Sequence, residues 1–416
     1  SFSDVLPNLS SHYNNTLVID GSPAMGIIAN DDAGIITVTP VNGSETGPVA
    51  GSFTFSLPAG TTADAPVTIN YALSGSAESV KDYSGTISGS VTIDKDKNST
   101  TLTLPVIDDA LVEDTETIVL NTGLVTSPYP ITVANSPQSL TISDNDQSAL
   151  TLTGPAKVTE GHSGTQNITY TITLDKATGS PFTIDYATSN GTASSTTDYN
   201  ASSGTLTFTG LAGESKDIAI LINGDQRIEA DETFSISLSD LSNTFNNRLS
   251  YQTSPVVTTI VNDDSGAITI TSENGSETGP VPASFTFSFP SGVSADAPTI
   301  INFGLSGTAT GTDYTGAGTS SIIIPAGVNS IRLPLSVIDD SFVENTETVV
   351  LTSGSVSSPY GITVANSPQS LEIADNDNAT LTISGATVTE GNSGTSTLSF
   401  TVTLDKDTGS PFTVEY

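Results

Sequence analysis

The chain has 416 residues, with 45 acidic and only 10 basic side chains and a net charge of −35. This negative charge excludes binding of a nucleic-acid backbone as a main role, and the absence of cysteine excludes disulfides, thiolate metal sites and cysteine nucleophiles. No apolar run approaches the roughly 18–20 residues that span a bilayer, so we expect no membrane insertion within this segment.

Self-similarity divides the chain into repeats of about 115 residues. The segment GSETGPV at 43–49 returns at 275–281, and VTEGHSG at 158–164 returns as VTEGNSG at 388–394. Each segment therefore recurs after about 231 residues, and the two kinds of segment are offset by about half that distance. This spacing indicates two alternating types of repeat, here called A-type and B-type.

The alternation predicts five tandem units in chain order. They are residues 1–32, the end of a B-type repeat; 33–146, an A-type repeat; 147–264, a B-type repeat; 265–377, an A-type repeat; and 378–416, the beginning of a B-type repeat. Both ends of the sequence fall inside units, so we expect a segment of a longer protein. The units should follow one another as an extended rod.

Short alternating segments predict the strands inside each repeat. Residues 52–57 read Ser-Phe-Thr-Phe-Ser-Leu, and similar alternation occurs at 67–73, 100–106 and 117–121. Thr, Val and Ile dominate these segments, and Gly, Pro, Asn and Asp separate them. We therefore expect an all-β fold in which each repeat is an immunoglobulin-like Greek-key sandwich of about seven strands.

Acidic residues recur at fixed positions of the repeats, at predicted strand ends and turns. A sandwich could gather them at one pole, where two like charges 4 Å apart cost about 4 kcal/mol at an effective dielectric constant of 20. Such a cluster needs protons or a cation, and ligation by oxygen alone at flexible spacing suits Ca²⁺ better than Mg²⁺. The alternative is that these acids are ordinary turn residues of an acidic surface.

The order of these acids resembles the Calx-beta family. The resemblance rests on a Glu in a Gly-rich turn, an Asp-Tyr pair at Asp82, the Asp-Asp-x-x-x-Glu-x-x-Glu element at 108–116 and the closing Asp-Asn-Asp at 144–146. It covers nearly the whole chain. It implies a seven-stranded immunoglobulin-like sandwich that binds Ca²⁺ at the pole where the last strand ends.

The resemblance also implies ligands for each repeat. In the first A-type repeat they are Glu45, Asp82, Asp109, the Leu111 carbonyl, Glu113, Glu116, Asp144 and Asp146. In the second A-type repeat they are Glu277, Asp313, Asp340, the Phe342 carbonyl, Glu344, Glu347, Asp375 and Asp377. In the B-type repeat they are Glu160, Asp198, Asp225, Glu229, Glu232, Asp263 and Asp264.

The B-type repeat departs from the family pattern. One residue is inserted before Asp225, and Asn262 replaces the first closing Asp, so we expect fewer or weaker ions there. His162 lies in a Gly-Ser-rich turn and is predicted to be solvated, because the matching residue of the next B-type repeat is Asn392. No catalytic constellation is found, and we expect no enzymatic activity.

Two functions are compared below, and a third, an accessory module of an enzyme, is left open by the sequence. The first is a calcium-rigidified stalk of a long secreted adhesin on a bacterial cell surface, similar to the gliding-motility adhesins of Bacteroidota. Its partners would be calcium, the neighbouring repeats and, through regions outside this segment, secretion or motility machinery and a surface ligand. The alternative is a calcium sensor coupled to a membrane transporter or exchanger. Tandem copies in this number favour the adhesin.

Overall fold

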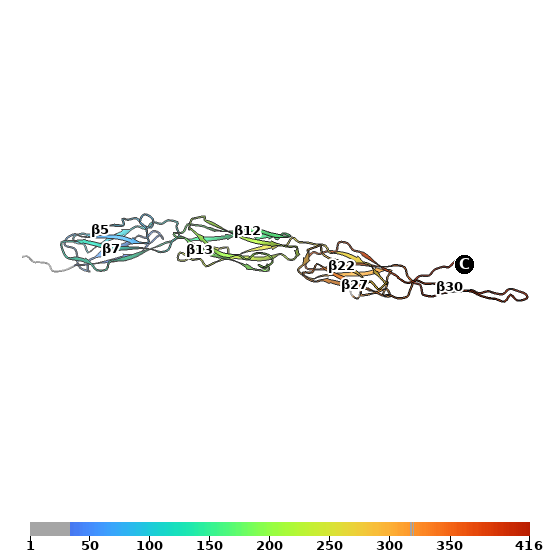
Figure 1. Cartoon of the computed structure of the whole chain (residues 1–416). Helices are drawn as coiled ribbons and strands as arrows, with labels where there is room; N and C mark the ends of the chain where they lie inside the picture. The colour runs from blue at the N-terminus through green and yellow to red at the C-terminus, as the bar shows by residue number, and fades with distance from the viewer. Residues whose placement is uncertain (1–33, 317, 319) are drawn as a thin grey trace, which may run out of the picture. The chain divides into compact units, whose positions relative to one another are not determined.

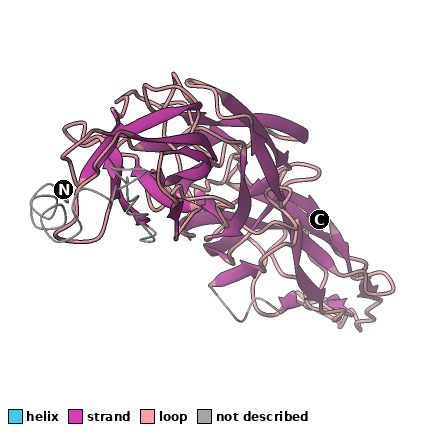
Figure 2. Ribbon diagram, turned by 90° about the vertical axis from the view of Figure 1, so that its left-hand side faces the viewer, coloured by secondary structure: helices cyan, strands magenta, loops and turns pink. Residues whose placement is uncertain are grey.

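The computed structural model describes residues 34–316, 318 and 320–416, and the regular elements of this part of the chain are all β-strands (Figures 1 and 2). The predicted partial repeat at 1–32 lies outside the described residues. A search of the described residues for an apolar helix of bilayer-spanning length found none.

The first sandwich is built from the first nine strands. A four-stranded sheet has the order β6-β3-β1-β8, and a five-stranded sheet has the order β2-β9-β7-β4-β5. The strands are β1 (Gly34–Val41), β2 (Gly43–Ser44), β3 (Gly51–Ser56), β4 (Val67–Gly75), β5 (Ser88–Ile93), β6 (Ser99–Leu104), β7 (Glu116–Thr126), β8 (Ile131–Val133) and β9 (Gln138–Ser143). Apart from the short pieces β2 and β8, seven strands remain, as predicted.

Alternation along the strands produces the core of this sandwich. In β3 every second residue is buried, so that Phe53 and Phe55 point inward and the intervening Ser and Thr residues face outward. Ile69 of β4 and Leu120 of β7 contribute to the same core cluster from the other sheet. All buried members of this cluster lie between residues 36 and 142, so the first repeat has a core of its own. The alternating segments predicted from the sequence are therefore confirmed as strands.

The second sandwich repeats this plan. Its sheets have the orders β15-β12-β10-β18 and β11-β19-β17-β13-β14. The strands are β10 (Ser148–Thr153), β11 (Lys157–Thr159), β12 (Gly164–Leu174), β13 (Phe182–Asn190), β14 (Ser203–Phe208), β15 (Ser215–Gly224), β17 (Glu232–Ser239), β18 (Leu249–Gln252) and β19 (Val256–Val261). Between β15 and β17 lies β16 (Arg227–Ile228), which pairs with β23 (Ser294–Ala295) of the third repeat.

The third sandwich has sheets of order β20-β22-β27-β25 and β21-β29-β28-β24-β26. The strands are β20 (Thr269–Glu273), β21 (Gly275–Ser276), β22 (Ala283–Ser288), β23 (Ser294–Ala295), β24 (Thr299–Gly307), β25 (Tyr314–Thr315), β26 (Ser321–Ile324), β27 (Ser330–Val337), β28 (Glu347–Ser357) and β29 (Gln369–Ala374). A final hairpin pairs β30 (Leu381–Ser384) with β31 (Thr401–Leu404).

The chain divides into two compact units. One unit holds the first sandwich, up to Ser148, together with two loops that belong in sequence to the second repeat, 176–180 and 244–249. The other unit holds the rest of the second repeat and everything after it. The contacts between the first repeat and those two loops therefore lie inside the first unit. The contacts between the second and third repeats lie inside the other unit.

Candidate metal centres

Parallel pairing brings the two ends of the first repeat's acidic pattern together. Strand β2 pairs in parallel with β9, and the backbone N–H of Glu45 donates to the carbonyl of Ser143, at 3.0 Å. Glu45 follows β2, and Asp144 and Asp146 follow β9. One carboxylate oxygen from each of these three acids lies within 4.8 Å of the others, and all three residues are buried.

A second group lies beside the first. Asp82 comes from the loop after β4, while Glu113 and Glu116 come from the loop before β7 and from its first residue. Their carboxylate oxygens also lie within 4.8 Å of one another. The N–H of Glu113 donates to Asp144, with 3.1 Å between N and Oδ2, so the two groups share a hydrogen bond.

Asp109 shapes the loop between these groups. Its Oδ1 accepts a hydrogen bond from the N–H of Leu111 at 2.7 Å, which is an Asx turn. Asp109 also raises the pKa of both Glu45 and Glu113 through its charge, which places it in the same electrostatic cluster. All the side chains predicted as ligands of the first A-type repeat therefore lie at one pole.

Crowding of carboxylates perturbs their protonation. Burial, then Asp144 as hydrogen-bond partner and neighbouring charge, raises the pKa of Glu45 to about 8. Burial and the charges of Asp82, Asp109 and Asp144 raise the pKa of Glu113 to about 7. A cation in the cluster would remove this repulsion, because opposite charge favours the ionised form of each acid.

Buried carboxylate oxygens without a partner indicate where a cation fits. Among the described residues these oxygens belong to Glu45 and Asp146 in the first repeat, to Asp264 in the second, and to Glu277, Glu347 and Asp377 in the third. A buried acceptor that lacks any hydrogen bond costs roughly 1–3 kcal/mol, and more when it is charged. A hard divalent ion bound by these oxygens would satisfy them, so the donor set fits Ca²⁺.

The third repeat reproduces the first. Glu277, Asp375 and Asp377 form one group within 4.8 Å. Burial, and a hydrogen bond that protonated Glu347 donates to Asp313, raise the pKa of Glu347 to about 7. As in the first repeat, the N–H of Phe342 donates to Asp340 Oδ1 at 2.8 Å, and the N–H of Glu344 donates to Asp375 Oδ2 at 3.2 Å.

The second repeat gathers its acids in a different arrangement. Glu160, Asp225 and Glu229 form a group within 4.8 Å. Burial, then the charges of Glu229, Asp225, Asp264 and Asp198, raise the pKa of Glu160 to about 8. Glu232 hydrogen-bonds to Asp198 and lies in the same cluster. Asn262 donates its side-chain N–H to the carbonyl of Asp264 instead of supplying a charge.

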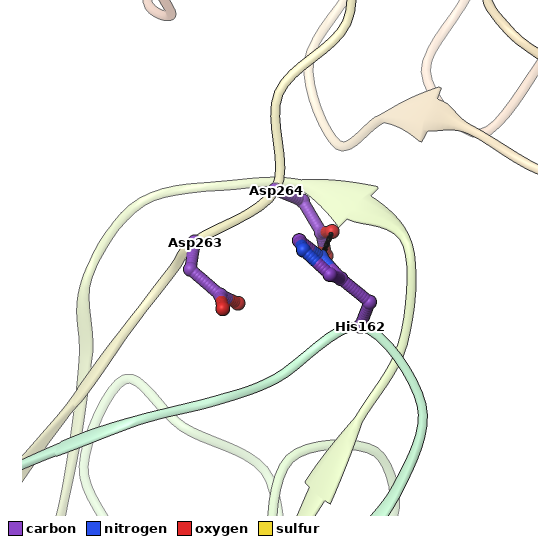
Figure 3. A group of neighbouring side chains, drawn as sticks. All are labelled: His162, Asp263 and Asp264. Carbon is purple, nitrogen blue, oxygen red and sulfur yellow. Dashed lines mark hydrogen bonds and ion pairs between the residues drawn. The ribbon is translucent and has the colours of Figure 1, made fainter.

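His162 lies beside the two closing acids of this repeat, Asp263 and Asp264 (Figure 3). Its Nδ1 pairs with Asp264 Oδ1, while Asp263 accepts a hydrogen bond from the N–H of Gly161 at 3.0 Å. The ring is exposed, as predicted for a turn residue, and its contact with Asp264 is an ion pair when the ring is protonated. The hydrogen bond and the two negative charges raise the pKa of His162.

Cations at the A-type poles come from the following repeat, which sequence reasoning missed. In the first compact unit Lys176 Nζ lies 3.1 Å from Asp146 Oδ1, and Arg248 Nε lies 3.3 Å from Asp144 Oδ2. Lys406 pairs in the same way with Asp377. Lys176 and Lys406 occupy the same position in two B-type repeats. In a chain with only 10 basic residues, this recurrence was the signal that could have revealed the contact.

Comparison with known proteins gives the family. The Calx-beta domain model matches residues 30–148, 144–265 and 303–387. Among solved structures, the chain is similar to the crystal structure of CBD12 from CALX1.2, with 15% identity, a TM-score of 0.24, and coverage of 55% of this chain and 99% of that one. It is also similar to the apo-form Calx CBD1 domain, with 22% identity, a TM-score of 0.23, and coverage of 28% and 98%. No match to a curated protein was found. Because the domain model matches most of its residues, the chain belongs to the Calx-beta domain family.

Proposed function

We propose that this chain is a calcium-binding structural segment, in which Ca²⁺ fixes the acidic pole of each A-type repeat. The observation that carries the proposal is the set of buried, unpartnered carboxylate oxygens, exemplified by Glu45 and Asp146. The ligands would be the acids predicted from the sequence. The seven acids of the first pole outnumber the two basic side chains that reach it, Lys176 and Arg248, so a divalent ion would offset the remaining negative charge.

Ion binding would join parts of the repeat that are far apart in sequence. The acids come from the turn after β2, from the loop before β7 and from the residues after β9. Asp144 and Asp146 begin the connection to the next repeat, so an ion held there would immobilise the start of that connection. We therefore assign calcium a stiffening role along the array.

We further propose that the array is a spacer in a long secreted cell-surface adhesin. Alternating repeats, scarce lysine and the lack of cysteine support this assignment. Extracellular modules typically bind calcium at roughly 10⁻⁴–10⁻³ M, where the ion outside cells keeps them occupied. An affinity in the micromolar range would instead favour the alternative, a calcium sensor coupled to a transporter.

Calorimetric calcium titration of the full chain, combined with thermal unfolding, tests the proposal. Bound ion stabilises the folded state by about 2.7 kcal/mol per site at a hundredfold excess over Kd. Chelation should lower the melting temperature, and equal Mg²⁺ should restore little of it. Identical melting curves in chelator and in millimolar calcium would show that the poles hold no calcium.

A further inference from the structure

The core of the third repeat contains a side chain from the second. Ile228 is only 4% exposed and belongs to the hydrophobic cluster of the third sandwich. It lies in β16, which pairs in parallel with β23, so that Ile228 is opposite Ala295. Its Cδ1 lies 3.7 Å from the position that a Cβ on Gly266 would occupy, beside Pro290 and Val293. The acidic loop of the B-type repeat thus inserts an aliphatic side chain into a socket of the next A-type repeat.

Polar contacts fix this insertion. The N–H of Asp296 donates to the carbonyl of Ile228 at 2.9 Å, and Arg227 pairs with Asp296 at 2.6 Å. An arginine followed by an aliphatic residue is therefore recognised by an apolar socket with an aspartate at its rim.

The first A-type repeat has the same socket without a side chain from a preceding repeat among the described residues. A cavity of about 470 Å³ is lined by Gly34, Leu57, Pro58, Thr61, Ala63 and Tyr129, among others. In sequence these match Gly266, Phe289, Pro290, Val293, Ala295 and Tyr360 of the third repeat, all about 232 residues later. The rim aspartate is also present, because Asp64, which lines the cavity and is exposed, matches Asp296.

We propose that this cavity of the first repeat is a docking socket for the acidic-loop tip of a B-type repeat. The aliphatic residue of the tip enters the cavity beside Ala63, and its arginine pairs with Asp64. The occupied socket of the third repeat is the structural argument for this occupant, since the same surface there is already an interface. The proposal concerns a protein-binding surface away from the acidic pole and does not depend on calcium ligation by the first repeat.

The loop of an A-type repeat is the wrong occupant. It carries Leu111-Val112 where the B-type loop carries Arg227-Ile228, so it has no cation for Asp64. Within its own compact unit Val112 instead bridges to Thr178, a residue of the B-type repeat. The two kinds of loop therefore have different sockets.

A binding assay with two separate proteins tests the socket. The full chain is immobilised, and the probe is a separate second repeat, residues 147–264, in which Ile228 is free. Both sheets of this repeat consist of its own strands, so it should fold alone. Saturable binding of the probe is expected in millimolar calcium. Ile228→Asp in the probe should weaken binding about tenfold or more, since burial of an isoleucine is lost.

Charge exchange distinguishes docking at this socket from general adhesion. Asp64→Lys in the chain should weaken binding of the unchanged probe, and Arg227→Glu in the probe should restore it to that variant. Circular dichroism confirms that each probe variant is folded. No binding, or binding that is insensitive to all three substitutions, would overturn the proposal.

Discussion

Replacing Glu45 by glutamine should stabilise the first repeat in the absence of calcium and weaken its response to calcium. Glu45 is buried, and its carboxylate oxygen lies within 4.8 Å of oxygens of Asp144 and Asp146. At an effective dielectric constant of 20, each such pair of charges repels by at least about 3.5 kcal/mol. Glutamine keeps the shape of the side chain but removes both repulsions.

Protonation of Glu45 limits the stability that the substitution can add. Because the pKa of Glu45 is raised to about 8, much of the repulsion is relieved by a proton at neutral pH. At about pH 8.5 the acid is largely ionised, and we expect Glu45→Gln to raise the free energy of unfolding by about 2 to 4 kcal/mol in chelator. In calcium the variant loses a charged ligand, and each tenfold loss of affinity removes about 1.4 kcal/mol of stabilisation.

The assay is chemical and thermal unfolding of residues 30–148, whose core cluster is its own. Asp94→Asn is the matched control, because Asp94 is exposed and outside the cluster. A variant that is less stable than the parent in chelator would behave as an ordinary buried substitution. That result, or an unchanged calcium response, would refute the electrostatic reasoning.

Four further outcomes are expected. Glu113→Gln should weaken calcium binding of an A-type repeat in titration calorimetry, whereas Asp94→Asn should not. In chelator the free energy of unfolding should fall as pH rises from about 5 to about 8. The reason is that Glu45, Glu113 and Glu116, whose pKa values are raised to about 8, 7 and 8, still hold protons in the folded state when the unfolded chain has released them. Thermal melts at a series of pH values should show the opposite slope in saturating calcium. Ile228→Ala should destabilise the third repeat by about 2 to 4 kcal/mol in hydrogen exchange, through the cavity left in its core. Small-angle scattering of the full chain should show a larger spread of dimensions in chelator than in calcium.

The strands and the positions of the acids could be predicted because both follow local rules. Alternation with period two at 52–57 and 67–73 matches β3 and β4, since a half-buried strand requires that pattern. Glu45 and Asp144 could be placed at one pole because they recur together in each A-type repeat. Their role as ligands stays a prediction.

The partners of these acids could not be predicted in the same way. Arg248 and Lys176 reach the first pole from loops far along the chain, and nothing local links them to Asp144 or Asp146. His162 was set aside because it has no repeated counterpart, although the fold places it on Asp264. Ile228 lies between Asp225 and Glu229 in sequence, and nothing local explains an aliphatic residue in this acidic loop. The explanation is its burial in the core of the third repeat.

The lysine contact at the A-type pole constrains how such an array can be extended. Asp146 and Asp377 each receive a lysine from the hairpin of a following B-type repeat, in the loop at 176–180 and at Lys406. The corresponding hairpins of A-type repeats, Leu-Pro-Ala-Gly-Thr-Thr-Ala-Asp at 57–64 and its counterpart at 289–296, contain no lysine. Two A-type repeats in succession would leave the closing aspartate without its cation. The pairing is therefore kept only where a B-type repeat follows each A-type repeat, as it does at both of these A-type poles.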